Sequence, residues 1–292
     1  MTMHENEFSI DEKLVYRLLN SQCRQWAHLS LQSVTSSGTD HALFRLGKDL
    51  VIRLPRLDGA INNINKEWEW LPQISPFLKT SISEPLFKGD PTEFYPYSWL
   101  VSPWHQGANP PLEKENEYAQ LAKDLASFLN QFHAIPLENG PYSRRGVPLK
   151  VFDEETRNAI QQLDGEIRTK QVTEIWEHFL ELPYWQKTLV WVHGDLLPGN
   201  VIIENTRLSA IIDFSDLGVG DPACDLIVAW SLFNKSSRNV FKEHLHDIDE
   251  QTWQRGRGLA LSIALIILPY YKHTNPGLVS VAKNMLKNVI CP

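Results

Sequence analysis

Several features that mark large classes of proteins are scarce or missing in this chain. Only three cysteines occur in 292 residues, at Cys23, Cys224 and Cys291, and none forms a C-x-x-C pair. This spacing argues against a disulfide framework and against a structural zinc site. The longest apolar run, residues 259–271, includes a serine and is too short to span a bilayer.

A surplus of positive charge and a leader segment are missing too. The formal net charge is −7, and no run of Lys and Arg suggests a groove for a phosphate backbone. The first residues, MTMHENEFSIDE, are polar and acidic, whereas a secretory signal would be basic and then apolar. We therefore expect a cytoplasmic protein that binds neither nucleic acid nor membranes. The length suits one large or two small domains, with ample material for a hydrophobic core.

The most informative stretch, residues 191–225, places two carboxylates and one amide in a fixed order. Asp195 follows an apolar segment and is therefore predicted on a short loop at a strand end. Asn200 comes next, before a pair of apolar runs that predict a β-hairpin over residues 201–212. Asp213 stands at the end of the returning strand. The hairpin is expected to bring the Asn200 and Asp213 oxygens together, with Asp195 on the loop beside them.

This set of residues suits magnesium-dependent phosphoryl transfer. Mg²⁺ prefers hard oxygen ligands and neutralises charge on the phosphate oxygens. Asp213 supplies a charged oxygen and Asn200 a neutral one, while Asp195 is placed to orient an acceptor hydroxyl and take its proton. Taken singly, each of these residues is more often a turn or cap residue. The interpretation therefore depends on the joint pattern.

Three segments of the same stretch resemble a known family. HGDLLPGN, IDFSD and GDPACDL are similar to the catalytic loop, the metal-binding strand and the following helix start of the aminoglycoside phosphotransferase-like kinases. That superfamily also includes choline, homoserine, fructosamine and macrolide kinases. The resemblance implies that Asp195 is the catalytic base and that Asn200 and Asp213 are the metal ligands. It also implies supporting roles around the site, for which the candidates are His193, Asp216 and Asp225.

The resemblance also implies the fold. We expect an α+β, bilobal, protein-kinase-like chain. Residues 1–103 would form a small nucleotide-binding lobe with an antiparallel sheet and a helix. Residues 104–292 would form a larger, mostly helical lobe that carries the catalytic groups and binds the acceptor.

The phosphate-covering loop of the family falls on a turn that holds Ser36, Ser37, Gly38 and Thr39. Small residues let backbone N–H groups approach phosphate oxygens, and the hydroxyls add donors. With a single glycine the turn is a weak motif, because an ordinary hairpin turn has the same composition. The nucleotide role of this segment therefore follows from the resemblance.

A cation on the strand predicted over residues 50–56 is expected to neutralise nucleotide phosphates. The position that carries Lys in protein kinases holds Arg53, which stays cationic but differs from Lys in reach and geometry. A helix is predicted from residue 60 to an end near Pro72, and its Glu67 is the best partner for Arg53. Glu69 is the rival acid. An exposed strand charge is an equally good interpretation of Arg53 from this strand alone.

The remaining site predictions concern the hinge and the acceptor. Ser102, Trp104 and His105 follow the last strand of the small lobe, where the family binds the purine edge, although Trp104 would suit packing between lobes equally well. Antibiotic kinases of the superfamily bind cationic sugars with acids and aromatics. The residues that fit this description in the second lobe are Asp249, Glu250, Trp253 and Tyr270. A run of acids is, however, more often a solvated face.

Together these patterns predict an enzyme that moves the γ-phosphate of ATP, or of GTP, to a hydroxyl of a small molecule with Mg²⁺. Leu197 stands where protein kinases place a Lys in the catalytic loop, which favours a small-molecule acceptor. The acceptor we expect is an aminoglycoside-like antibiotic or another amino sugar or amino alcohol, and a metabolite unrelated to antibiotics is the alternative. The competing hypothesis is a catalytically silent nucleotide-binding scaffold, motivated by Arg53 and the thin glycine loop.

Overall fold

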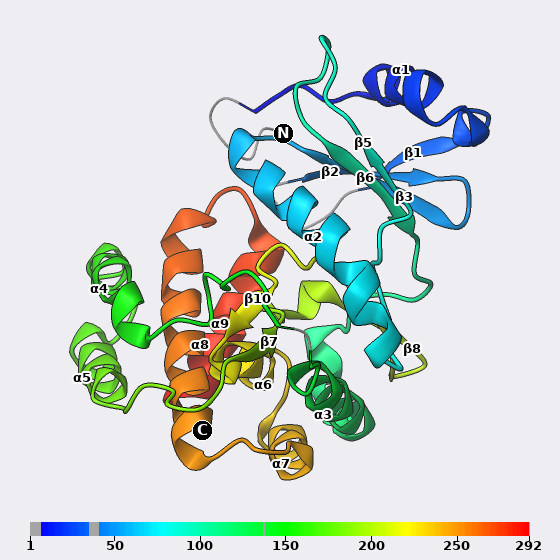
Figure 1. The fold of residues 1–292 in the computed structure, drawn as a ribbon. Helices are drawn as coiled ribbons and strands as arrows, with labels where there is room; N and C mark the ends of the chain where they lie inside the picture. Colours follow the sequence, from blue (N-terminus) through cyan, green and yellow to red (C-terminus); the bar gives the residue numbers. More distant parts are fainter. Residues whose placement is uncertain (1–6, 35–40, 137, 292) are drawn as a thin grey trace.

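The computed structural model describes residues 7–34, 41–136 and 138–291, which form one lobe rich in strands and one rich in helices (Figure 1). The smaller lobe is built mainly from the chain up to the end of strand β6 (Trp99–Pro103). The bilobal α+β arrangement predicted from the sequence is therefore confirmed. The predicted phosphate-covering turn, with Ser36, Ser37, Gly38 and Thr39, lies outside the described residues.

The smaller lobe is built on a five-stranded antiparallel sheet with strand order β1-β2-β3-β6-β5. Alternation along the strands buries Phe44 and Ile52 on one face, in a core shared with helix α1 (Glu12–Gln22). The other face carries Arg53, which bonds to helix α2 (Ile61–Ile74). The other strands of the sheet are β1 (Leu31–Val34), β2 (His41–Leu46), β3 (Leu50–Pro55) and β5 (Phe87–Gly89).

Helix α2 continues past Pro72, so the end predicted there is wrong. Pro72 lies in the last turn, where its missing N–H removes one hydrogen bond and leaves the preceding turns intact. The helix ends at Ile74, and a 3₁₀ helix follows directly. The helical period buries Glu67 completely and leaves Glu69 exposed.

The larger lobe is an assembly of helices around α8 (Glu250–Tyr270), which is apolar on nearly all sides and packs against α4, α5, α9 and the 3₁₀ helix η7. In the described part of the chain, no helix is long and apolar enough to cross a membrane. The other α-helices of this lobe are α3 (Ala119–His133), α4 (Asp153–Gln162), α5 (Thr169–Leu180), α6 (Val228–Ser231), α7 (Lys235–His244) and α9 (Pro276–Ile290). The 3₁₀ helices of the chain are η1 (Arg24–Trp26), η2 (Asp58–Ala60), η3 (Ser75–Phe77), η4 (Leu112–Glu117), η5 (Leu149–Phe152), η6 (Pro198–Asn200) and η7 (Pro222–Ile227).

The strands of the 191–225 stretch form two small sheets in the larger lobe. Strands β7 (Val190–Val192) and β10 (Gly218–Gly220) form an antiparallel pair. Strands β8 (Val201–Glu204) and β9 (Arg207–Ile211) form the predicted hairpin. Strand β4 (Ser81–Ile82) comes from the first hundred residues, yet it pairs in parallel with β9. The chain of the smaller lobe therefore enters a sheet of the larger one.

Candidate active site

The loop that follows β7 is held by one buried carboxylate. The backbone N–H groups of His193 and Gly194 donate to the two oxygens of Asp225, at 3.1 and 2.8 Å. Asp225 is fully buried at the start of the helical segment that follows β10. A third donor is His133, at the end of α3, whose Nε2 lies 2.9 Å from Asp225 Oδ2. Asp225 thus fixes the backbone that carries Asp195.

Replacing Asp225 by Asn is expected to weaken the fold and the loop together. The amide keeps one acceptor oxygen, but its NH₂ group faces donors, so a buried donor is left without a partner. We expect a loss of about 1–3 kcal/mol in the free energy of unfolding, measured by urea denaturation. The matched control is Glu177→Gln, because Glu177 is an exposed acid that pairs with Arg157 on the surface, and its loss should cost under about 1 kcal/mol. Equal effects of the two variants would contradict this assignment.

The side chain of His193 connects the loop to the end of β9. Its Nε2 lies 3.1 Å from the carbonyl oxygen of Ile212, and its Nδ1 accepts the N–H of Asp195 at 3.2 Å. The proton therefore sits on Nε2, and Nδ1 is an acceptor. The ring packs on Phe214, with ring centroids 4.6 Å apart. Both nitrogens are engaged, so His193 positions Asp195 and is not free to exchange a proton with a ligand.

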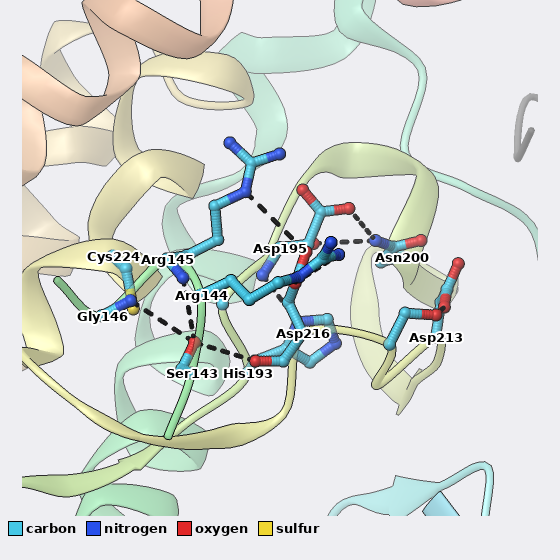
Figure 2. A network of polar contacts seen from close by, with 12 residues as sticks. Ser143, Arg144, Arg145, Gly146, His193, Asp195, Asn200, Asp213, Asp216 and Cys224 are labelled. Carbon is cyan, nitrogen blue, oxygen red and sulfur yellow. Dashed lines mark hydrogen bonds and ion pairs between the residues drawn. The ribbon is translucent and has the colours of Figure 1, made fainter. Parts of the chain in front are cut away.

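Asp195 and Asn200 form the centre of the polar network in Figure 2. The Asn200 amide nitrogen donates to the backbone oxygen of Asp195 at 2.7 Å and to its Oδ2 at 3.2 Å. Burial raises the pKa of Asp195 to about 6, a shift that Arg145 opposes and the carboxylate of Asp216 reinforces. At neutral pH the carboxylate is mostly ionised, which is the form that accepts a proton.

Asp213 follows β9 in a left-handed backbone conformation, with φ of 61°. Asp is among the few residues that visit this region at low cost. Its Oδ1 accepts from Arg53 at 3.1 Å and from the Ser215 hydroxyl. Burial alone would raise the pKa of Asp213, but the Arg53 guanidinium holds it below its ordinary value. The side chain is 34% exposed, so its ionised carboxylate is accessible to a ligand.

Arg53 joins the two lobes through carboxylates. One terminal nitrogen donates to Glu67 of α2, and the other donates to Asp213. The structure thus pairs Arg53 with Glu67 and leaves the rival Glu69 exposed. Burial alone would lower the pKa of Arg53, but the two carboxylates raise it above its ordinary value, so the guanidinium stays charged. Arg53 is a nearly buried ion-pair residue, and the exposed-charge interpretation of the sequence is wrong.

The donor set beside Asp195 fits a hard cation. The amide nitrogen of Asn200 is turned to Asp195, so its oxygen lies on the other side, toward Asp213 (Figure 2). Asp213 Oδ1 is shared by Arg53 and Ser215, which leaves Oδ2. Among the described residues no cluster of three or more His, Cys, Asp or Glu side chains suits a metal. One amide and one carboxylate are nonetheless enough for Mg²⁺, which keeps several waters and takes phosphate oxygens as ligands.

The three hinge candidates, Ser102, Trp104 and His105, differ in what their groups contact. The Trp104 N–H donates to the carbonyl oxygen of Asp49 at 2.8 Å, so it extends the sheet and is not free for a purine. The Trp104 ring lies under the Arg45 guanidinium, 4.7 Å from the ring centroid. Ser102 is fully buried and pairs with Val51 within the sheet. Burial lowers the pKa of His105, which lies half-buried just after the strand.

The predicted acceptor residues are not brought to Asp195. Asp249 caps helix α8 by accepting the N–H of Thr252 at 2.8 Å, and Glu250 pairs with Lys242 at 2.6 Å. Trp253 is buried beside Trp230. This end of α8 lies next to α7, on the side of the lobe away from the strand-rich lobe (Figure 1). The structure therefore does not bring Asp249, Glu250 and Trp253 to the side of the lobe that faces the strand-rich lobe. Tyr270, at the opposite end of α8, is exposed.

Several residues of the site were not anticipated from the sequence. Asn109 donates from its amide to the carbonyl oxygens of Gly199 and Val201, at 2.8 and 2.9 Å, and so holds the turn that carries Asn200. Arg144 and Arg145 approach from the loop before α4, where Arg144 Nε donates to Asp216 Oδ1 at 2.9 Å. No periodicity marks these residues. The only signal is two adjacent arginines in a segment of turn-forming residues.

Comparison with known proteins places this geometry in a family. A family model described as the phosphotransferase enzyme family matches residues 32–259. The chain belongs to this family. As a phosphotransferase of this family it is a small-molecule kinase with an alcohol group as acceptor, in agreement with the sequence prediction. The matched segment includes Arg53, Asp195, Asn200 and Asp213.

Individual relatives of this phosphotransferase are distant. The uncharacterized protein YcbJ of Bacillus subtilis (strain 168) is 22% identical over 225 residues, 72% of this chain and 71% of that one. An aminoglycoside 3'-phosphotransferase of Escherichia coli is 28% identical over 122 residues, 40% of this chain and 45% of that one. The solved complex of APH(2")-IIia with GDP and kanamycin superimposes with a TM-score of 0.75 and 18% identity, over 95% of this chain and 98% of that one. This likeness shows a shared kinase-like fold.

Proposed function

We propose that this phosphotransferase moves the γ-phosphoryl group of ATP to a hydroxyl of a small molecule in the cytoplasm, with Mg²⁺ bound. The observation that supports this most directly is the grouping of Asp195, Asn200 and Asp213 around one accessible point. A carboxylate held for proton transfer beside two free side-chain oxygens is the arrangement that phosphoryl transfer needs. GTP in place of ATP is compatible with the same groups. We place the division between the two lobes near residue 103.

The proposed chemistry gives each residue a distinct task. Asp195 takes the proton of the acceptor hydroxyl while the oxygen of that hydroxyl bonds to the γ-phosphorus. The bond from that phosphorus to the β–γ bridging oxygen breaks, and ADP leaves with the electron pair. Asn200 and Asp213 would hold Mg²⁺, which when bound neutralises charge on the phosphate oxygens. Arg53 is placed to neutralise nucleotide phosphates from the smaller lobe, with Glu67 fixing its guanidinium.

The test is Mg-ATP consumption against a panel of aminoglycosides, macrolides, amino alcohols, sugars and hydroxy acids. We expect phosphorylation of at least one class, dependent on Mg²⁺ and abolished by chelation with EDTA. Protein that binds Mg-ATP but transfers phosphate to no acceptor would favour the silent scaffold. Protein that does not bind Mg-ATP at all would contradict the proposal.

A further inference from the structure

The loop of residues 141–146 is fixed against the strands that carry the catalytic segment. The Val219 N–H donates to the Pro141 carbonyl at 2.7 Å, and the Ser143 N–H donates to the Val219 carbonyl at 3.1 Å. The Ser143 hydroxyl donates to the carbonyl oxygen of Asp216 at 2.9 Å. Gly146 and Gly220 pack so closely that a Cβ on either would lie under 3 Å from the other backbone. The loop therefore has one defined position relative to Asp195.

Two arginines at the tip of this loop lie beside the catalytic carboxylate. Arg145 acts on Asp195 electrostatically, and it lies on the opposite side of the Asp195 carboxylate from Asn200 in Figure 2. Arg144 Nε donates to Asp216 Oδ1 at 2.9 Å, and Arg144 Nη2 forms an ion pair with the same oxygen at 2.9 Å. The Arg144 side chain is 73% exposed and that of Arg145 is 29% exposed. Both guanidiniums thus keep N–H groups that a ligand can reach.

The position of these arginines assigns them to the acceptor. Nucleotide phosphates belong on the side of Asn200 and Asp213, where the free side-chain oxygens are. The acceptor hydroxyl must touch Asp195, and the rest of the acceptor then extends away from that side, toward Arg145.

The acids near the acceptor position are already neutralised. Asp216 is paired with Arg144, and its other oxygen lies 3.8 Å from Arg145. Lys66 of α2 is a third cation near Asp216 and Arg144, since the charges of both residues act on it. Burial lowers the pKa of Lys66, Asp216 opposes that shift and Arg144 adds to it. The acids predicted to bind a polycation, Asp249 and Glu250, lie elsewhere in the lobe with partners of their own.

From this arrangement we infer that the acceptor is an anionic alcohol, whose carboxylate or phosphate group is bound by Arg144 and Arg145 while its hydroxyl faces Asp195. The inference rests on the proposed function and names its substrate class. A guanidinium binds carboxylate and phosphate in the same bidentate geometry, so both anions fit the pair. A polycationic aminoglycoside would bring its ammonium groups against two arginines, which disfavours it.

The experiment compares alcohols that differ by one anionic group: glycerol with glycerate, glucose with gluconate and with glucose 6-phosphate, and kanamycin as the polycation. ADP release from Mg-ATP gives kcat/KM for each. We expect the anionic member of at least one pair to exceed its neutral counterpart by 10-fold or more. Arg145→Gln and Arg144→Gln should each lower that selectivity ratio toward unity, by about 10-fold where the wild-type ratio is large enough. Both alcohols of a pair react at Asp195, so an effect of Arg145 on Asp195 changes both kcat/KM values alike and leaves their ratio unchanged.

The matched control is Arg157→Gln, which removes an arginine that pairs with Asp153 on α4 and should leave the ratio unchanged. Faster turnover of neutral alcohols or of kanamycin would overturn the inference and leave the proposed function intact. Failure of every anionic member to be phosphorylated, or to bind protein loaded with Mg-ATP, would overturn it as well. So would arginine variants that raise KM for ATP without changing the ratio. Loss of Mg-ATP binding by the wild-type protein would instead contradict the proposed function.

Discussion

Replacing Asp195 by Asn is expected to lower kcat by a factor on the order of 10²–10⁴, which is the usual contribution of a general base. The substitution keeps the shape of the side chain and the contact with Asn200, so the loop should stay in place. The amide cannot take the hydroxyl proton, so chemistry is lost while nucleotide affinity is kept. The measurement is steady-state turnover of the best acceptor, together with calorimetric titration of Mg-ATP.

The matched control for this variant is Asp249→Asn. Asp249 caps α8, and Asn is an equally good N-cap residue, so both stability and turnover should be unchanged. An Asp195→Asn protein that turns over at the wild-type rate would remove Asp195 from the reaction. A variant that loses Mg-ATP binding as well would show that Asp195 organises the nucleotide site.

Arg53→Met should produce the largest loss of stability that we predict. Glu67 is fully buried and takes its side-chain hydrogen bond from Arg53, so the variant leaves an uncompensated charge in the interior. Breaking a buried ion pair from one side costs about 3–5 kcal/mol in the free energy of unfolding. Denaturation in urea measures this directly. The variant also removes the cation proposed to neutralise the nucleotide phosphates and leaves Asp213 without its partner. Nucleotide affinity should therefore fall independently of the lost stability.

A double variant separates the two effects of Arg53. In Arg53→Met/Glu67→Leu the buried charge is gone, so most of the lost stability should return, because an apolar pair of similar volume is often as stable as the ion pair. Affinity for Mg-ATP should stay low, because the cation that faces the phosphates is still missing. Recovery of both properties would show that Arg53 has a structural role only. Arg53→Lys, with one donor group instead of a fork, should fall between the wild type and Arg53→Met.

The grouping of Asp195, Asn200 and Asp213 was predictable because local chain geometry brings these residues together. Asn200 and Asp213 flank the hairpin of β8 and β9, whose apolar runs and turn are visible in the sequence. Glu67 was predictable from helical period, which separates it from Glu69 by half a turn or more. Asn200 and Asp213 are separated by a single hairpin, and in the helix that carries Glu67 the periodicity selects the buried face.

The acceptor side was not predictable in this way. The Ser143 hydroxyl donates to the carbonyl oxygen of Asp216 across a long stretch of chain, and no periodic pattern predicts a loop that packs on a strand. The capping contact of Asp249 was also overlooked, although Thr252 three residues later is in the position for which an N-cap aspartate supplies a hydrogen bond. No pattern in the sequence indicated that one hinge N–H, that of Trp104, extends the sheet beyond Pro103.

The parallel pairing of β4 with β9 means that the lobes share more than a single connection. Ser81 and Ile82 lie opposite Ala210 and Ile211, two residues before Asp213. A rotation of the strand-rich lobe would therefore act on a chain fastened at two points, the β6 segment and β4. Such a double attachment permits rotation about the line through both points and resists rotation about other axes. It also means that a fragment ending at residue 103 would carry β4 without the strand that completes it.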